Sequence, residues 1–171
     1  MSLALRLAAL LAATTAFTTA ATAQDYGPYG MAGGGGFGGY GFDWDGFYAG
    51  VYGGGVPFGE TSLNAGIFTG VNVSLDAAVV GVEAQLGADF ADSTSFDALV
   101  MGKGGMTFGD ALVYATGGVG VVSGDWGYAL GGGAEYGFTD YMSVRGEVLG
   151  TGDWNGMPDD MRLTAGVAFH L

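Results

Sequence analysis

The residues best suited to chemistry in this sequence are a few bases set among many acids. After position 23 the only basic side chains are Lys103, Arg145 and Arg162, against 17 Asp and Glu residues. Opposite charges that share one face of an element can form a buried ion-pair network or line a charged constriction. The acids on the corresponding faces complete the candidate site, and they are Glu83, Asp89, Asp97, Glu135 and Glu147.

Nucleophilic and metal-assisted catalysis lack the residues that they need. His170 is the single histidine and the chain has no cysteine, so no His/Cys cluster can hold a transition metal. Ser123 and Ser143 lie in no recognisable nucleophile motif, and a Ser-His-acid triad would have to use the penultimate residue. The sequence therefore predicts a protein that is not an enzyme, with no cofactor and no metal.

Two further motifs point away from ligand binding. Asp153, Asp159 and Asp160 lie close together in the stretch 151–160, but they lack the Asp/Asn spacing and terminal Glu of an EF-hand. We expect a solvated loop there. The alternative is that the loop weakly binds a divalent cation that bridges to lipopolysaccharide phosphates. The strings GGGGFGG and GGVGVV are not followed by a helix, so they do not predict a phosphate-binding loop.

The elements that must position the charges are strands. From Trp44 onward, runs of about ten residues alternate apolar with small or polar side chains, which is typical of transmembrane β-barrels. In the run 78–90, Val80, Val82, Leu86 and Phe90 share one face, whereas the other face holds Gly81, Glu83, Gln85, Gly87 and Asp89. One face suits lipid and the other suits polar neighbours.

The alternation predicts eight strands. An even number of antiparallel strands allows the sheet to close, so that no strand edge is left unpaired in lipid. Tight turns are expected at 75–77, 108–110 and 139–141, and longer outward loops at 55–62, 91–95, 123–125 and 151–160. The eight runs are 46–54, 63–73, 78–90, 96–107, 111–122, 126–138, 142–150 and 161–171.

Closure would place the three bases and their acids in the lumen. A Lys or Arg that faces lipid at the bilayer midplane costs about 2–4 kcal/mol, so pairing inside the barrel is favoured. An eight-stranded barrel is only just wide enough for its own side chains, which favours a structural network. The alternative is a channel, because small lumen residues leave room, among them Gly81, Gly87, Gly105, Gly131 and Gly133.

The chain divides into three parts. Residues 1–23 resemble a signal peptide, with Arg6, an apolar stretch and a small-residue cleavage site before Gln24; a retained membrane anchor is the alternative. Residues 24–43 are rich in Gly, Tyr and Phe and are expected to be a flexible leader, with a weak tether as the alternative. Residues 44–171 are the predicted barrel.

Charge excludes one class of partner, and the surface pattern weighs against one alternative fold. Once residues 1–23 are removed, three Lys and Arg face 17 Asp and Glu, a formal charge of −14. Nucleic acid is excluded because no basic patch could neutralise phosphates. A soluble exported β-sandwich also shows alternation, but the apolar outer faces here would need a partner sheet.

Four segments can be compared with known families. They are WDGFYAGVYGG at the first strand, GVNVSLDAAVVGVEAQLGADF at the second hairpin, FGDALVYATGGVGVV, and WGYALGGGAEYGFTDYMSVRGEVLGTGDW. These segments resemble the small OmpA-like, opacity-type outer-membrane barrels of alphaproteobacteria. The resemblance extends from Trp44 to the end of the chain. Members of that family usually end on an aromatic residue, whereas here Phe169 is followed by His170 and Leu171.

Alternation and resemblance together lead to one expectation. The chain is expected to be an all-β protein, an eight-stranded antiparallel up-and-down transmembrane barrel of the outer membrane with both termini in the periplasm. Its role would be structural, in envelope integrity or surface interaction, and the alternative is a narrow porin-like channel. Expected partners are outer-membrane lipid, lipopolysaccharide and, during insertion, the barrel-assembly machinery, with the protein as a monomer.

Overall fold

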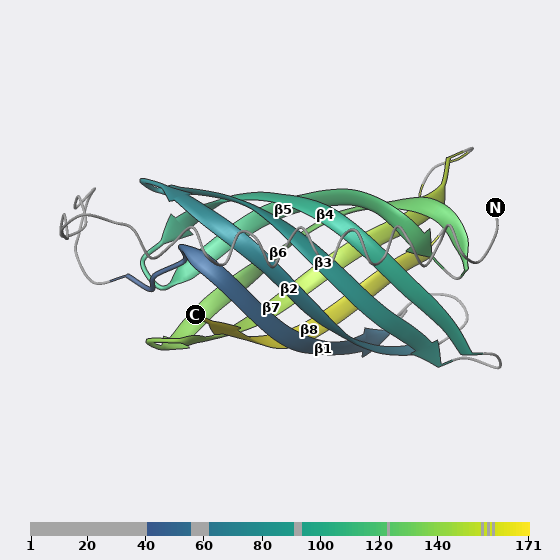
Figure 1. Ribbon diagram of the computed structural model, residues 1–171, viewed down its shortest axis with the longest axis horizontal. Helices are drawn as coiled ribbons and strands as arrows, with labels where there is room; N and C mark the ends of the chain where they lie inside the picture. Colours follow the sequence, from purple (N-terminus) through teal and green to yellow (C-terminus); the bar gives the residue numbers. More distant parts are fainter. Residues whose placement is uncertain are drawn as a thin grey trace. The chain divides into compact units, whose positions relative to one another are not determined.

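The eight alternating runs form eight strands that close into a ring. The computed structural model describes residues 41–55, 62–90, 94–122, 124–154, 156, 158 and 160–171. Each strand pairs antiparallel with its neighbours in sequence, and the last strand returns to pair with the first (Figure 1). The strands are β1 (Gly46–Gly55), β2 (Leu63–Leu75), β3 (Ala78–Phe90), β4 (Thr94–Phe108), β5 (Ala111–Val122), β6 (Asp125–Thr139), β7 (Met142–Asp153) and β8 (Asp160–His170). The expected all-β barrel is confirmed.

Closure depends on the pairing of β1 with β8. Their register runs from Tyr48 opposite His170 to Gly55 opposite Leu163, so both edges of the sheet are paired. Backbone N–H and C=O groups in the ring therefore have partners without water. None of the described residues forms a helix that is long and apolar enough to cross a membrane.

Strand boundaries differ from the predicted runs by a few residues. The largest difference is in β7, which was expected to end at 150 and continues to Asp153, where it pairs with Gly127 of β6. Gly150 and Gly152 carry no side chain to continue an apolar alternation, although their backbone extends the hydrogen-bond ladder. The pattern of side chains therefore ends before the strand does.

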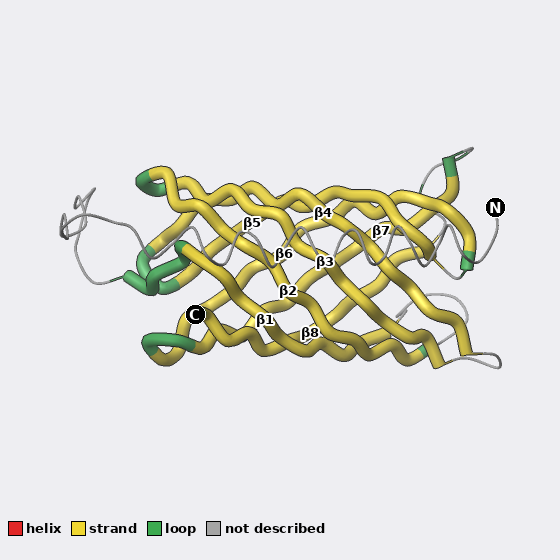
Figure 2. Tube along the Cα trace, in the orientation of Figure 1, coloured by secondary structure: helices red, strands yellow, loops and turns green. Residues whose placement is uncertain are grey.

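The two ends of the barrel differ, and we call them the turn end and the loop end. Three tight turns, at residues 76–77, 109–110 and 140–141, lie together at the turn end (Figure 2), as the sequence predicts. Asp76 and Gly109 take positive φ angles of 58° and 63°, which suits a short polar residue and glycine in two-residue hairpins. Leu171 also lies at the turn end, because its N–H donates to the carbonyl of Phe47 at 2.9 Å.

The two faces of the sheet separate apolar from polar side chains. On β3, Val80, Val82, Leu86 and Phe90 point outward with about half of each side chain exposed, whereas Glu83 is 3% exposed and points inward. β6 and β8 follow the same rule, with Trp126, Leu130, Leu163 and Phe169 exposed. The predicted assignment of the faces is confirmed for these strands.

Several expected segments lie outside the described residues. These are the signal peptide at 1–23, residues 24–40 of the leader, Ser123, Asp159 and parts of the outward loops at 56–61 and 91–93. Residues 41–43, assigned by the sequence to the leader, belong to the described structure. Phe42 is half-buried there because its ring packs against Trp44, with centroids 4.5 Å apart.

Candidate functional site: the charged lumen

The candidate site occupies the interior of the barrel. All eight predicted residues are buried, with at most 7% of any of them exposed. They come from five strands, namely β3, β4, β6, β7 and β8. The structure divides them into two groups. We call Glu83, Lys103, Glu135, Arg145 and Glu147 the central network, and Asp89, Asp97 and Arg162 the loop-end cluster.

Arg145 is the hub of the central network. Its Nη1 and Nη2 donate to Glu83 Oε2 and Oε1 at 2.7 and 2.9 Å, which is the bidentate arrangement that guanidinium and carboxylate groups favour. Nη2 also donates to Glu147 Oε1 at 3.3 Å, and Nη1 lies 3.9 Å from Glu135 Oε1. One guanidinium therefore faces three carboxylates, and Lys103 supplies the second positive charge.

Lys103 is held in a different way. Its Nζ donates to Glu135 Oε1 at 3.0 Å. The same nitrogen lies over two aromatic rings, 4.5 Å from the centroid of Tyr48 and 4.8 Å from that of Tyr114. The ring faces stabilise a cation whose water has been removed.

Neutral side chains complete the network, and the sequence analysis did not predict their part in it, although it placed Gln85 on the polar face. Tyr48 Oη donates to Glu83 Oε2 and Tyr114 Oη donates to Glu147 Oε2, both at 2.7 Å. Gln85 Nε2 lies 2.8 Å from Glu83 Oε1 and 3.2 Å from Glu147 Oε1, so one amide joins two acids. The alternation of side chains could have indicated these residues, because they share the inward face with the acids.

The loop-end cluster is smaller. Arg162 Nη2 lies 2.9 Å from Asp89 Oδ2, and its Nη1 donates to Asp97. With all groups ionised, this cluster has two acids to one base and the central network has three acids to two bases. Each group therefore carries one net negative charge.

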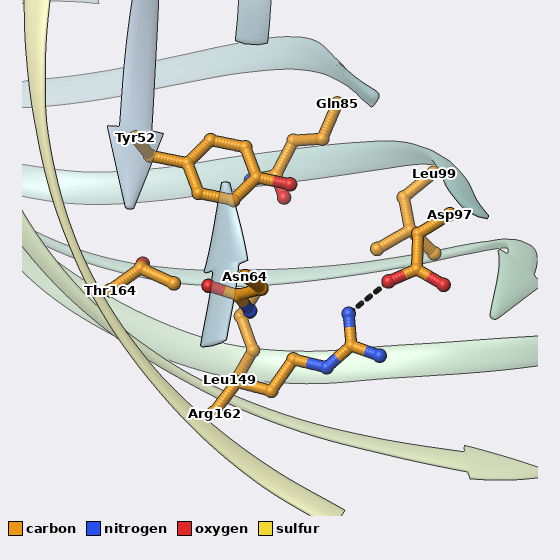
Figure 3. A pocket seen from close by; sticks show the side chains of 8 residues that line it. All are labelled: Tyr52, Asn64, Gln85, Asp97, Leu99, Leu149, Arg162 and Thr164. Carbon is orange, nitrogen blue, oxygen red and sulfur yellow. Dashed lines mark hydrogen bonds and ion pairs between the residues drawn. The ribbon is translucent and has the colours of Figure 1, made fainter. Parts of the chain in front are cut away.

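A small cavity lies beside the loop-end cluster and is lined by Asp97 and Arg162 together with Gln85 (Figure 3). The volume open to the centre of a water molecule is about 10 Å³, close to the minimum for one bound water. Asn64 lies beneath the ring of Tyr52, and its Oδ1 is buried and has no hydrogen-bond partner among the described residues. The side chains around the cavity are Tyr52, Asn64, Gln85, Asp97, Leu99, Leu149, Arg162 and Thr164.

The room expected at the lumen glycines is already occupied. An added β-carbon at Gly133, for example, would lie 2.7 Å from Tyr114 Oη. Large side chains thus sit over glycines, which is a known way to fill and curve a barrel. The side chains that such a β-carbon would meet are Asn72 at Gly81, Tyr52 at Gly87, Tyr114 at Gly133 and Leu149 at Gly131, whereas at Gly105 it would meet the carbonyl oxygen of Val113 and the Cβ of Tyr114. These glycines do not support a channel.

His170 and Ser143 meet at the turn end without forming a catalytic relay. Ser143 Oγ lies 3.0 Å from His170 Nε2. Ser143 is fully buried, and His170 Nδ1 has no hydrogen-bond partner within the described part of the chain. A triad needs an acid at that second nitrogen and access for a substrate. The described residues also contain no group of three or more His, Asp or Glu side chains placed to hold a metal ion.

Comparison with known proteins gives a likeness of fold. No protein-family model and no curated protein sequence matches the chain. A solved structure described as "De novo design of transmembrane beta-barrels" is similar, with a TM-score of 0.57 and 14% sequence identity over 75% of this chain and 98% of that chain. The chain is thus an eight-stranded barrel that resembles designed transmembrane β-barrels.

A double-mutant cycle tests whether the central network acts as one unit. Arg145→Met leaves three buried acids short of a partner, so we expect it to lower the free energy of unfolding by about 3–5 kcal/mol. Glu83→Gln combined with Arg145→Met should cost less than the sum of the single changes, because the double variant removes both members of a buried pair. The measurement is equilibrium urea unfolding in lipid vesicles.

The control is the cycle of Glu83→Gln with Arg162→Met. Glu83 and Arg162 belong to different groups, so their effects should add within about 0.5 kcal/mol. Additivity in the Glu83–Arg145 cycle would contradict the described network.

Proposed function

We propose that this protein is a non-enzymatic β-barrel of the bacterial outer membrane that contributes to envelope integrity as a sealed structural element. One observation carries the proposal: no outward-facing position of the eight described strands holds a charged side chain. The outward residues are apolar apart from two threonines and two tyrosines. Such a surface suits a hydrocarbon environment, whereas soluble proteins rarely expose an apolar area of this extent.

The outward apolar residues of the eight strands form a belt around the barrel, which we call the apolar belt. Its height supports the same proposal. On β4 the aromatic residues Phe96 and Phe108 mark its two ends, and on β6 the corresponding residues are Trp126 and Phe138. The residues of each pair are 12 positions apart in the sequence, which is about 40 Å at roughly 3.3 Å per residue. A strand tilt of about 40° reduces this to a height of about 30 Å, close to the hydrocarbon core of a bilayer.

Thr69 is the one hydroxyl near the middle of the belt on β2. Its Oγ1 donates to the backbone carbonyl of Tyr48 on β1 at 3.0 Å. The hydroxyl therefore needs no water, which removes most of the cost of placing it in lipid.

The orientation is part of the proposal. Outer-membrane barrels have short periplasmic turns and longer outer loops, so the turn end, with Leu171 and residues 41–45, would face the periplasm. The loop end would face lipopolysaccharide, and the barrel-assembly machinery would insert the chain as a monomer. Membership of the OmpA-like, opacity-type barrels is proposed on the sequence resemblance.

A sealed interior supports a structural role. The charged side chains of the candidate site are paired, aromatic rings cover several of the lumen glycines, and the described cavity has room for about one water. A solute path would require several of these contacts to break together.

A narrow channel is the second candidate, because the lumen is polar and has a net negative charge. Two net negative charges, one in each group, would favour cations in any path that opened. The sealed form should give no single-channel steps in planar bilayers. Reproducible steps with a cation-selective reversal potential would replace the structural role with the channel.

Substitutions on the outer face test the lipid contact. Ala115 and Ala111 share β5 and its outward face, but Ala115 lies near the middle of the belt and Ala111 lies beside the turn. We expect Ala115→Arg to lower the free energy of unfolding in vesicles by about 2–4 kcal/mol and Ala111→Arg by about 0–1 kcal/mol. Equal costs at the two positions would mean that the belt does not face lipid.

Removal of the protein from its cell tests the envelope role. Cells without it should take up more of a normally excluded hydrophobic dye and should be more sensitive to detergent. The wild-type gene should restore both properties. Unchanged dye uptake and detergent sensitivity in the deletion strain would refute the structural role.

A further inference from the structure

Residues 41–45 extend across the lumen at the turn end. Gly41 packs against the β4–β5 turn, where an added β-carbon would lie 2.9 Å from the carbonyl oxygen of Gly109. Phe42 covers Gly137 of β6, and Asp45 Oδ1 accepts a hydrogen bond from the N–H of Ser74 on β2 at 2.8 Å. This five-residue segment therefore contacts several sides of the ring.

Trp44 fills the space inside the ring. Its side chain is 3% exposed and packs with Val79, Leu112 and Tyr114 in one buried apolar cluster. Phe42 and His170 surround it, with ring centroids 4.5 and 5.5 Å from that of Trp44. Val79 and Leu112 lie at the turn-end starts of β3 and β5, so the rings close the lumen on the turn-end side of the central network. Tyr114 joins the two, because its Oη donates to Glu147.

Gly46 is where the chain leaves the strand for the lumen. Its φ is +104°, a value that side-chain-bearing residues rarely adopt, and an added β-carbon would lie 3.2 Å from the carbonyl oxygen of Leu171. Glycine at this position allows the segment to turn inward from β1.

The segment is held less firmly than the strands are. Among the described residues, 41–45 make no backbone–backbone hydrogen bond to the ring, whereas each strand pairs on both sides. The indole N–H of Trp44 is buried with no partner in the described structure, so release would return it to water. Segments with few backbone bonds open before the strand ladders do.

We propose that residues 41–45 are a releasable stopper that closes the lumen at the turn end, separately from the central network. This proposal concerns the barrel alone and does not depend on whether the protein contributes to envelope integrity. Its release would leave all eight strands paired and would expose the turn-end lumen around His170 to the solvent.

Tryptophan fluorescence reports on the stopper directly. The chain has three tryptophans, and the variant Trp126→Phe/Trp154→Phe leaves Trp44 alone. In detergent micelles, Trp44 should be protected several-fold against both acrylamide and a brominated detergent, because it faces neither water nor the apolar belt. The variant Trp44→Phe/Trp154→Phe, which reports on the exposed Trp126, should be quenched by the brominated detergent. Quenching of Trp44 as strong as that of Trp126 would overturn the proposal.

A matched pair of glycine variants tests release in the same background. An added β-carbon at Gly137 overlaps the Phe42 ring, whereas one at Gly146 meets nothing within 4 Å. Gly137→Val should therefore make Trp44 accessible to acrylamide while the barrel stays folded, and Gly146→Val should leave Trp44 protected. Continued protection in folded Gly137→Val would contradict the stopper.

A urea titration of the variant that keeps only Trp44 tests release without changing the residues that the stopper packs against. Trp44 should become accessible to acrylamide at lower urea than is needed to unfold the strands, as followed by circular dichroism. Loss of protection only together with the strands would show that the segment is a fixed part of the core and would overturn the claim of release.

Discussion

Arg145 places a permanent charge near the centre of a ring that excludes water. Removing such an ion from water costs several kcal/mol, which only well-placed partners can offset. One partner comes from far along the chain, since Glu83 lies 62 residues away, whereas Glu147 lies two residues away on the same strand. The tyrosines and Gln85 then satisfy the remaining carboxylate oxygens. Much of the lumen is arranged around this one guanidinium.

The narrowness of an eight-stranded ring explains the glycine content. The lumen must hold a charge network together with several aromatic rings, and the facing positions must be small to admit them. Tyr48 lies over Gly70, Tyr52 over Gly66 and Gly87, and Phe68 over Gly50. The arrangement fills the interior closely, which favours a sealed barrel over an open one.

The sequence predicted the fold well because a closed barrel repeats one simple rule. Alternation assigned Glu83 and Arg145 to the inner face and Val82 and Leu163 to the outer face, and short turns set the strand order. The structure buries all eight charged residues of the candidate site.

The partners within the lumen could not be predicted in the same way. Glu83 and Arg145 meet across the ring from β3 and β7, which are not neighbouring strands, so no local pattern links them. The division into two groups, the roles of Tyr48 and Tyr114, and the filled space over the glycines all depend on side-chain length and barrel curvature. The inward course of Phe42 and Trp44 could not be predicted for another reason. The glycine-rich sequence around them shows no periodicity that would assign their side chains to a face.

Gel migration of the purified outer-membrane fraction, boiled and unboiled in the same detergent, tests the central claim most directly. A closed barrel whose strands are paired all round should resist the detergent when cold, so boiling should shift the band. An unshifted band, with the protein in the soluble periplasmic fraction, would contradict a sealed barrel in the membrane.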